Sequence, residues 1–180
     1  KGAKPLRLSI EERAALWAEA ARALNKSIDE APRIFYEGYI ALSTVKLEFE
    51  KDPDAALELV QIASEIDPSK PQGHVSTARV LASRGRHDEA ISSFLTALGL
   101  LTSSQNPEDA EVAASLKPDL AACYTAKGTA AAEAANAAAA AGQPAAARGG
   151  DAEKFFEAAL QYVPDHAAAK LGLAEELFLR

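Results

Sequence analysis

Apolar residues recur along most of this chain at alternating steps of three and four residues, the spacing that places side chains on one face of an α-helix. The first stripe begins beside Ser9 and Glu12, which have the spacing of a capping box at a helix start. Pro32 predicts the end of this helix. Trp17 is expected in the core, where it would hold the helix against the next one. The stripe contains Ile10, Ala14, Trp17, Ala21, Leu24 and Ile28.

Prolines, glycines and capping residues divide the middle of the chain into further helices. After a helix over about 32–50, Asp52 is expected to cap a helix that has Pro53 as its first residue. Pro71 opens another helix, which Gly85 ends. The expected helices are 32–50, 53–66, Pro71 to the break at Gly85, and 87–101, joined by short turns that are typical of antiparallel helical hairpins.

The second half of the chain is less regular. Residues 102–113 are expected to form a linker or a short helix, with Asn106 and Pro107 as a helix start. A helix over about 115–128 tolerates Pro118 in its first turn, where no intrahelical bond is lost. The alanine-rich stretch then favours helix to about Ala141. A break is predicted by Gly142, Pro144, Gly149 and Gly150. Further helices are expected at about 151–162 and 167–179.

Small and bulky residues recur in two of these helices at a spacing of 34 residues, and the same ladder returns near the C-terminus. A fixed period of roughly 20–50 residues indicates stacked supersecondary units. Small residues let two helices approach closely, and an aromatic ring fills the space beyond the crossing. The ladder consists of Ala56, Val60, Ala63 and Pro68, then Ala90, Phe94, Ala97 and Thr102, then Ala152, Phe156, Ala159 and Pro164.

These residues resemble the tetratricopeptide repeat (TPR) family, whose motif is a helix-turn-helix of about 34 residues. Residues 71–104 match it most fully, and their string RGRHDEAISSFLTAL is similar to the second-helix signature of the family. Residues 37–70 match with Val60 in place of the aromatic residue. A third repeat fits in two pieces, because about 19 residues are inserted at its interhelical turn. Its first piece contains Leu120, Ala121, Tyr124 and Gly128.

The resemblance implies an all-α fold, a TPR-type right-handed superhelix of antiparallel helical hairpins whose first helices line a concave groove. The implied organisation is an N-terminal capping helix or degenerate repeat at 1–36, repeats at 37–70 and 71–104, a linker at 105–113, a repeat at 114–166 with an alanine-rich insert at about 129–150, and a C-terminal capping helix at 167–180.

Charge and cysteine content narrow the class of partner and site. The net charge of −7 disfavours a nucleic-acid surface, since the densest basic cluster is only Arg84, Arg86 and His87. The single cysteine, Cys123, excludes an internal disulfide, is compatible with a reducing compartment, and is expected to pack as a small apolar residue. No apolar run approaches the ~20 residues that span a bilayer, so no membrane insertion is expected. The chain starts at Lys1 and contains no methionine, which indicates a processed form or fragment and leaves the compartment open.

No catalytic or metal-binding constellation is apparent in the sequence. His74, His87 and His166 lie far apart and lack the spacing of metal ligands, so structural or capping roles are expected. Gly149 and Gly150 lack the lysine and hydroxyl residue of a phosphate-binding loop. We therefore expect no enzymatic activity, no cofactor and no bound metal.

The concave groove is expected to carry few charges. Some TPR proteins clamp an acidic peptide terminus with Lys, Asn and Arg on successive first helices, but of the corresponding positions here only Arg79 has that chemistry. Those positions are Ala41, Val45, Val75, Arg79, Pro118 and Ala122. The alternative for Tyr39 and Phe49 is packing between repeats. The candidate groove contacts are Tyr39, Phe49, Gln72, Arg79 and Ser83.

A second candidate surface is the C-terminal helix, which has an apolar face where an end helix is normally polar. Leu171, Leu177 and Phe178 are its candidate contacts, with Ala174 on the same face. We expect this edge to be covered by further repeats, by a partner, or by a second copy in a homo-oligomer.

The resemblance thus implies a non-enzymatic scaffold that holds a protein partner, as a peptide or helix, in its groove and at its C-terminal edge. A peptide adaptor and a subunit or assembly factor of a larger complex are both open. The alternatives are an RNA-binding helical-repeat protein and a regulatory domain of an enzyme missing from this fragment. RNA binding by pentatricopeptide repeats involves a period of about 35 residues and a basic groove, which the repeat spacing and the net charge disfavour.

Overall fold

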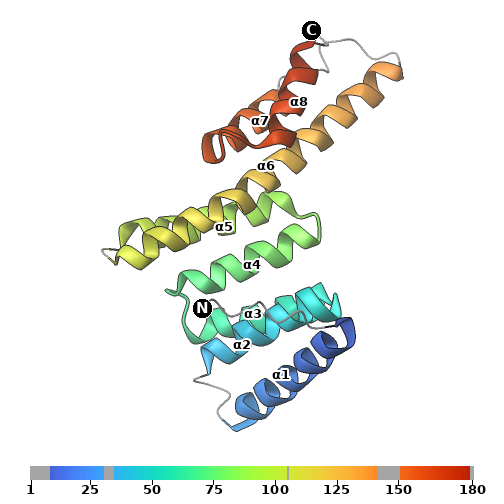
Figure 1. The fold of residues 1–180 in the computed structure, drawn as a ribbon. Coiled ribbons are helices and arrows are strands. Elements are labelled where there is room, and N and C mark those ends of the chain that lie inside the picture. Colours follow the sequence, from blue (N-terminus) through green and yellow to red (C-terminus); the bar gives the residue numbers. More distant parts are fainter. Residues whose placement is uncertain (1–8, 31–34, 105, 142–150, 179–180) are drawn as a thin grey trace, which may run out of the picture. The chain divides into compact units, whose positions relative to one another are not determined.

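A computed structural model describes residues 9–30, 35–104, 106–141 and 151–178 (Figure 1). Every regular element in these ranges is helical, which confirms the predicted all-α class. The chain forms two compact units, residues 1–80 and 81–180, whose boundary lies within α4. The elements are α1 (Ile10–Glu30), α2 (Tyr36–Thr44), the π-helix η1 (Val45–Glu50), α3 (Pro53–Ile66), α4 (Pro71–Ser83), α5 (His87–Ser103), α6 (Pro107–Ala140), α7 (Asp151–Tyr162) and α8 (Ala167–Phe178).

Local capping chemistry fixes where several of these helices begin. The predicted capping box at α1 is confirmed: the Glu12 N–H donates to Ser9 Oγ at 3.1 Å, and the Ser9 N–H donates to Glu12 Oε2 at 2.7 Å. Asp52 caps α3 as expected by accepting the Ala55 N–H at 3.0 Å. Gly85 has a φ of +73°, which explains a glycine at the end of α4.

In unit 1 the buried residues of α3 pack against α2. Ala56, Val60 and Ala63 have no exposed surface, and Ala63 shares a core cluster with Tyr36 and Tyr39 of α2. This is the arrangement that the ladder of small residues predicts, because alanines at the crossing let the two helices approach.

Trp17 does not lie in the core, so that expectation was wrong. It is 37% exposed, and α1 contributes no buried residue. Its indole instead stacks on Phe49 of η1 with ring centroids 6.3 Å apart, so it does connect α1 to the next helical segment. Because nothing described covers the far side of α1, its apolar stripe stays partly in solvent, and Ile10 is 78% exposed.

In unit 2 the long helix α6 packs on α5 along its first part and on α7 and α8 along its later part (Figure 1). Six of the ladder residues are again buried, whereas Thr102 and Pro164 are exposed. Phe156 and Ala159 share a core cluster with Ala121 of α6 and Ala169 of α8. The aromatic rings of Tyr124 and Tyr162 stack at 5.9 Å and extend the contact between α6 and α7. The buried ladder residues of this unit are Ala90, Phe94, Ala97, Ala152, Phe156 and Ala159.

The helix start expected at Asn106 and Pro107 is confirmed, since Asn106 caps α6 by accepting the Glu108 N–H at 3.1 Å. The stretch expected as a linker or short helix is thus helical from Pro107. The position expected for Pro118 needs correction. Pro118 consequently lies inside α6 and not in a first turn. Both Pro118 and Ala114 are exposed, so the carbonyl that loses its helical donor faces water. The predicted helical alanine stretch is confirmed to Ala140, whereas the break expected at 142–150 lies outside the described residues.

Candidate functional site

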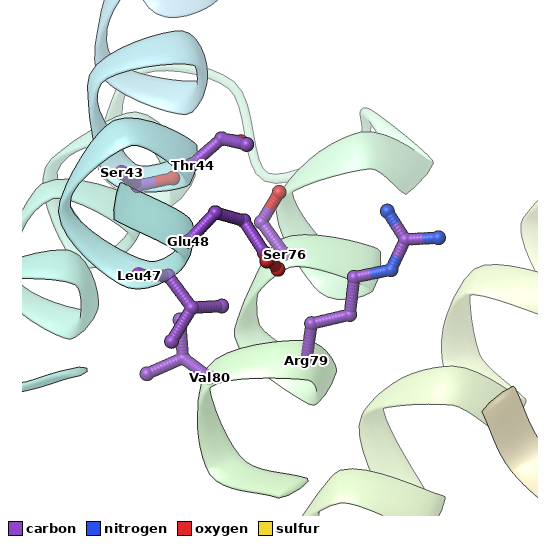
Figure 2. A pocket seen from close by; sticks show the side chains of 7 residues that line it. All are labelled: Ser43, Thr44, Leu47, Glu48, Ser76, Arg79 and Val80. Atoms are coloured by element: carbon purple, nitrogen blue, oxygen red, sulfur yellow. The ribbon is translucent and has the colours of Figure 1, made fainter. Parts of the chain in front are cut away.

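A small polar hollow lies within unit 1, between the α2–η1 segment and α4 (Figure 2). Figure 2 shows Glu48 projecting from η1 toward α4, from which Ser76 and Arg79 project. The volume of the hollow is about 40 Å³, enough for one or two water molecules or the tip of a side chain but not for a small-molecule substrate. It is lined by Ser43, Thr44, Leu47, Glu48, Ser76, Arg79 and Val80.

The backbone fixes two hydroxyl groups at this hollow. Ser43 Oγ and Thr44 Oγ1 both donate to the Ile40 carbonyl, at 2.7 and 3.1 Å. Their single hydrogens are thus used within the helix, and each oxygen presents only lone pairs to a neighbour. Thr44 is exposed, so its oxygen can accept a hydrogen bond from an N–H of a bound segment.

The π-helical turn η1 supplies Leu47 and Glu48 to the hollow. A π-helix has an extra residue per turn relative to an α-helix, and such turns are frequent at functional sites. The segment ends at Lys51, which has a φ of 56°, and the Asp52 N–H donates to the Lys46 carbonyl at 2.9 Å. An ion pair of 2.7 Å between Lys46 and Glu50 spans the same turn.

An ion pair connects α2 to the turn before α4. Lys70 Nζ lies 2.6 Å from Glu37 Oε1 and 4.4 Å from the centroid of the Tyr36 ring. The hydrogen bond from Lys70 lowers the pKa of Glu37, and burial raises the pKa of Tyr36. Gly73 allows this close approach, since a Cβ there would lie 3.1 Å from the Tyr36 hydroxyl, which is a tight contact. The first helices of the two predicted repeats are thus held at their N-terminal ends.

The structure separates the predicted groove residues. Arg79 lines the hollow, whereas Gln72 and Ser83 are exposed on α4 but do not line it. Tyr39 is only 7% exposed and lies in the core cluster with Tyr36 and Ala63. Phe49 is 39% exposed and stacks on Trp17, so the indole already covers one face of its ring.

Two positions assigned to the concave groove are buried. Val45 and Val75 lie in the core, so the register assumed for the groove was wrong there. The hollow uses Thr44, Glu48 and Ser76 instead, which sequence reasoning missed. Thr44 and Glu48 are one turn apart on the helix, and that spacing was the only available signal; the change to π-helical geometry at Val45 could not be read from it.

The C-terminal helix exposes the apolar residues expected of it. Leu171, Leu177 and Phe178 are 62%, 52% and 88% exposed. Leu173 faces the other way and packs against the core cluster around Phe156. The expectation that further repeats, a partner or a second copy cover this face stays a prediction.

Cys123 and His166 have structural roles. Cys123 is buried, so the expectation of a cysteine packed as a small apolar residue is confirmed, and burial together with Asp119 raises the pKa of its thiol to about 11. His166 caps α8, because its Nδ1 lies 3.3 Å from the Ala169 N–H. Within the described ranges, no three His, Cys, Asp or Glu side chains come together as a metal site would require. No described helix is both long and apolar enough to cross a membrane.

Comparison with solved structures decides the fold. The chain is similar to MamA, with 15% identity, a TM-score of 0.58 and coverage of 95% of this chain and 84% of MamA. It is also similar to TTC0263, a thermophilic TPR protein of Thermus thermophilus, with 20% identity, a TM-score of 0.50 and coverage of 92% and 75%. The chain has a TPR fold. The TPR resemblance seen in the sequence is thereby confirmed at the level of the fold, although no family model and no curated protein matches the sequence.

Proposed function

We propose that this chain is a non-enzymatic TPR scaffold that binds a protein partner along the first helices of its repeats. The proposal is supported chiefly by the hollow in unit 1, where side chains of α2, η1 and α4 face a common space. In a TPR fold these are the first helices of successive hairpins, which form the surface available to a ligand.

The chemistry of this surface suits a peptide and not a small molecule. The hollow is too small for a substrate, and it presents a carboxylate at Glu48, a guanidinium at Arg79 and an acceptor oxygen at Thr44. Donors and acceptors spaced along neighbouring helices match the repeated N–H and C=O groups of an extended segment. The partner would therefore lie across α2 and α4, with one side-chain tip in the hollow.

Site-specific photocrosslinking tests this proposal. A benzophenone amino acid replaces Gln72, which is exposed on α4, and in a separate protein it replaces Gln61, which is exposed on α3. After irradiation in native extract, mass spectrometry should find one recurrent partner peptide attached at position 72. The Gln61 variant is the matched control, because α3 is a second helix and faces away from the first-helix surface in the TPR fold.

The alternatives give different results. Equal labelling from positions 61 and 72 would contradict a first-helix binding surface. Retention of RNA at low salt in a filter-binding assay would favour a nucleic-acid-binding protein instead. A permanent subunit, unlike a peptide adaptor, would give crosslinks from several faces to the same partner.

A further inference from the structure

A larger hollow in unit 2 lies between the late turns of α6, α7 and the exposed side of α8. Its volume is about 330 Å³. A cavity of ~150 Å³ accommodates a benzene-sized group, so this hollow has room for a large apolar side chain. It is lined by Thr129, Ala132, Glu133, Asn136, Phe156, Ala168, Leu171, Gly172, Glu175 and Glu176.

The inserted segment builds one wall of this hollow. Four lining residues, Thr129 to Asn136 in α6, belong to the stretch that the repeat spacing identifies as an insertion. In the structure this stretch continues α6 beyond the turn at which a TPR first helix ends. Without the extension, the wall that α8 provides would face solvent.

The lining of the hollow is partly apolar and partly acidic. Ala168 and Leu171 provide exposed apolar surface beside the nearly buried ring of Phe156. The charged lining residues, Glu133, Glu175 and Glu176, are exposed or half-buried and form an acidic rim. No basic side chain lines it, and none of the three carboxylates forms an ion pair with another described residue. Each therefore keeps its charge available to a ligand.

We infer that this hollow binds a basic amphipathic segment of a partner protein, with one large apolar side chain inside and Lys or Arg side chains on the carboxylates. Charge complementarity supports this choice of occupant, because a neutral apolar ligand would leave three carboxylates unpaired and a nucleic acid would be repelled. Leu171 continues the surface onto the exposed face of α8. The inference rests on the proposed scaffold function and gives the C-terminal edge a partner chemistry.

A synthetic helical peptide tests the inference. The probe carries one Phe flanked by Lys one turn to each side, and two companion peptides have Glu for Lys or Ala for Phe. Fluorescence anisotropy should show that the Lys–Phe peptide binds more tightly than either companion, with an affinity that falls as salt rises. In an NMR titration of the whole chain, the amide signals of Thr129, Asn136 and Gly172 should shift.

Three variants distinguish the hollow from general attraction to an acidic protein. In E133Q/E175Q/E176Q the rim loses its charge, and the Kd should rise about ten-fold. The matched control, E58Q/E65Q/E111Q, makes the same change in net charge at exposed positions elsewhere and should stay within about two-fold of the original Kd. Ala168→Trp fills the hollow from an exposed position and should weaken binding while leaving the rim intact.

Several outcomes would overturn the inference. These are an equal loss in the rim and control variants, no effect of Ala168→Trp, or no difference between the Lys and Glu peptides. Concentration-dependent shifts of the Gly172 amide without peptide would assign the hollow to a second copy of the chain. Crosslinking at position 72 in unit 1 reports on the scaffold function separately, so either proposal can fail without the other.

Discussion

Alanine in place of Gly128 should lower the free energy of unfolding, although alanine is the better helix former. A Cβ at this position in α6 would lie 2.6 Å from Cε1 of Phe156 and 2.8 Å from its Cδ1. Gly172 of α8 faces the same ring, and its Cβ would lie 2.4 Å from Cζ. The ring is only 2% exposed, so it cannot move without displacing the packing of α7.

The sign of the effect follows from two opposing magnitudes. Replacing glycine by alanine in a helix interior stabilises it by about 1 kcal/mol. Overpacking a buried side chain costs about 1–3 kcal/mol. We therefore expect Gly128→Ala to be less stable than the original chain by about 1 kcal/mol.

Gly99 provides the matched control in the same unit. It is exposed on α5, and no heavy atom lies within 4 Å of the Cβ that alanine would add. Gly99→Ala should therefore raise the free energy of unfolding by about 0.5–1 kcal/mol. The two substitutions are chemically identical, and their opposite signs isolate the contact with Phe156.

Urea denaturation followed by far-ultraviolet circular dichroism measures both variants. A double-mutant cycle with Phe156→Leu, which leaves room for the new methyl group, should give a coupling energy of about 1–2 kcal/mol. If Gly128→Ala stabilised the chain as much as Gly99→Ala does, the close approach between α6 and the Phe156 ring would be refuted.

Three further predictions concern single side chains. Tyr36→Phe should raise the free energy of unfolding in urea by about 1 kcal/mol, because the buried hydroxyl lies beside the backbone of Gly73 without a hydrogen bond of good geometry to it or to another described residue. A loss of stability would show that the contact with Gly73 is a stabilising hydrogen bond. Cys123 has a pKa of about 11 in the folded chain against an ordinary 9.0, so at pH 8 its thiolate fraction should be roughly 100-fold smaller than in the unfolded chain, and its alkylation should be slower by a similar factor. Because the folded chain holds this proton more tightly, the free energy of unfolding should fall as the pH rises from 9.0 toward 11. Phe49→Ala should red-shift the emission of Trp17 and increase its quenching by acrylamide, since their stacking is removed; unchanged spectra would exclude the contact.

The features that sequence predicts well are those determined within one or two turns of helix. The capping box of Ser9 and Glu12 and the cap at Asp52 each involve a side chain and a backbone N–H three residues away. The ladder through Phe94 and Phe156 was also recoverable, because crossing helices impose the same requirement for small and large residues in every repeat. Local rules and repetition therefore predict the helices and the fold.

The features that the sequence did not predict depend on the tertiary neighbours of a residue and on its exposure to solvent. Trp17 has the position of a core residue on its own stripe, yet it stacks on Phe49 and stays 37% exposed. Pro118 would end most helices, but the carbonyl it leaves unpaired faces solvent, so α6 continues. Val45 begins the π-helical turn and lies in the core, and Glu48 of the same turn lines the hollow. Each outcome is decided by tertiary surroundings that the local pattern does not contain.

The insertion after Gly128 shows how a repeat can be extended without losing its core. Alanine supports helix with little side-chain volume, so the added residues extend α6 and do not interrupt the packing of Phe156 and Ala159 below them. An extension made only of alanine would present a helix surface without polar or charged side chains. Glu133 and Asn136 are among its few polar positions, and both line the hollow beside α8. Two of the few polar residues in this segment therefore line the hollow at which we propose that a basic partner segment binds.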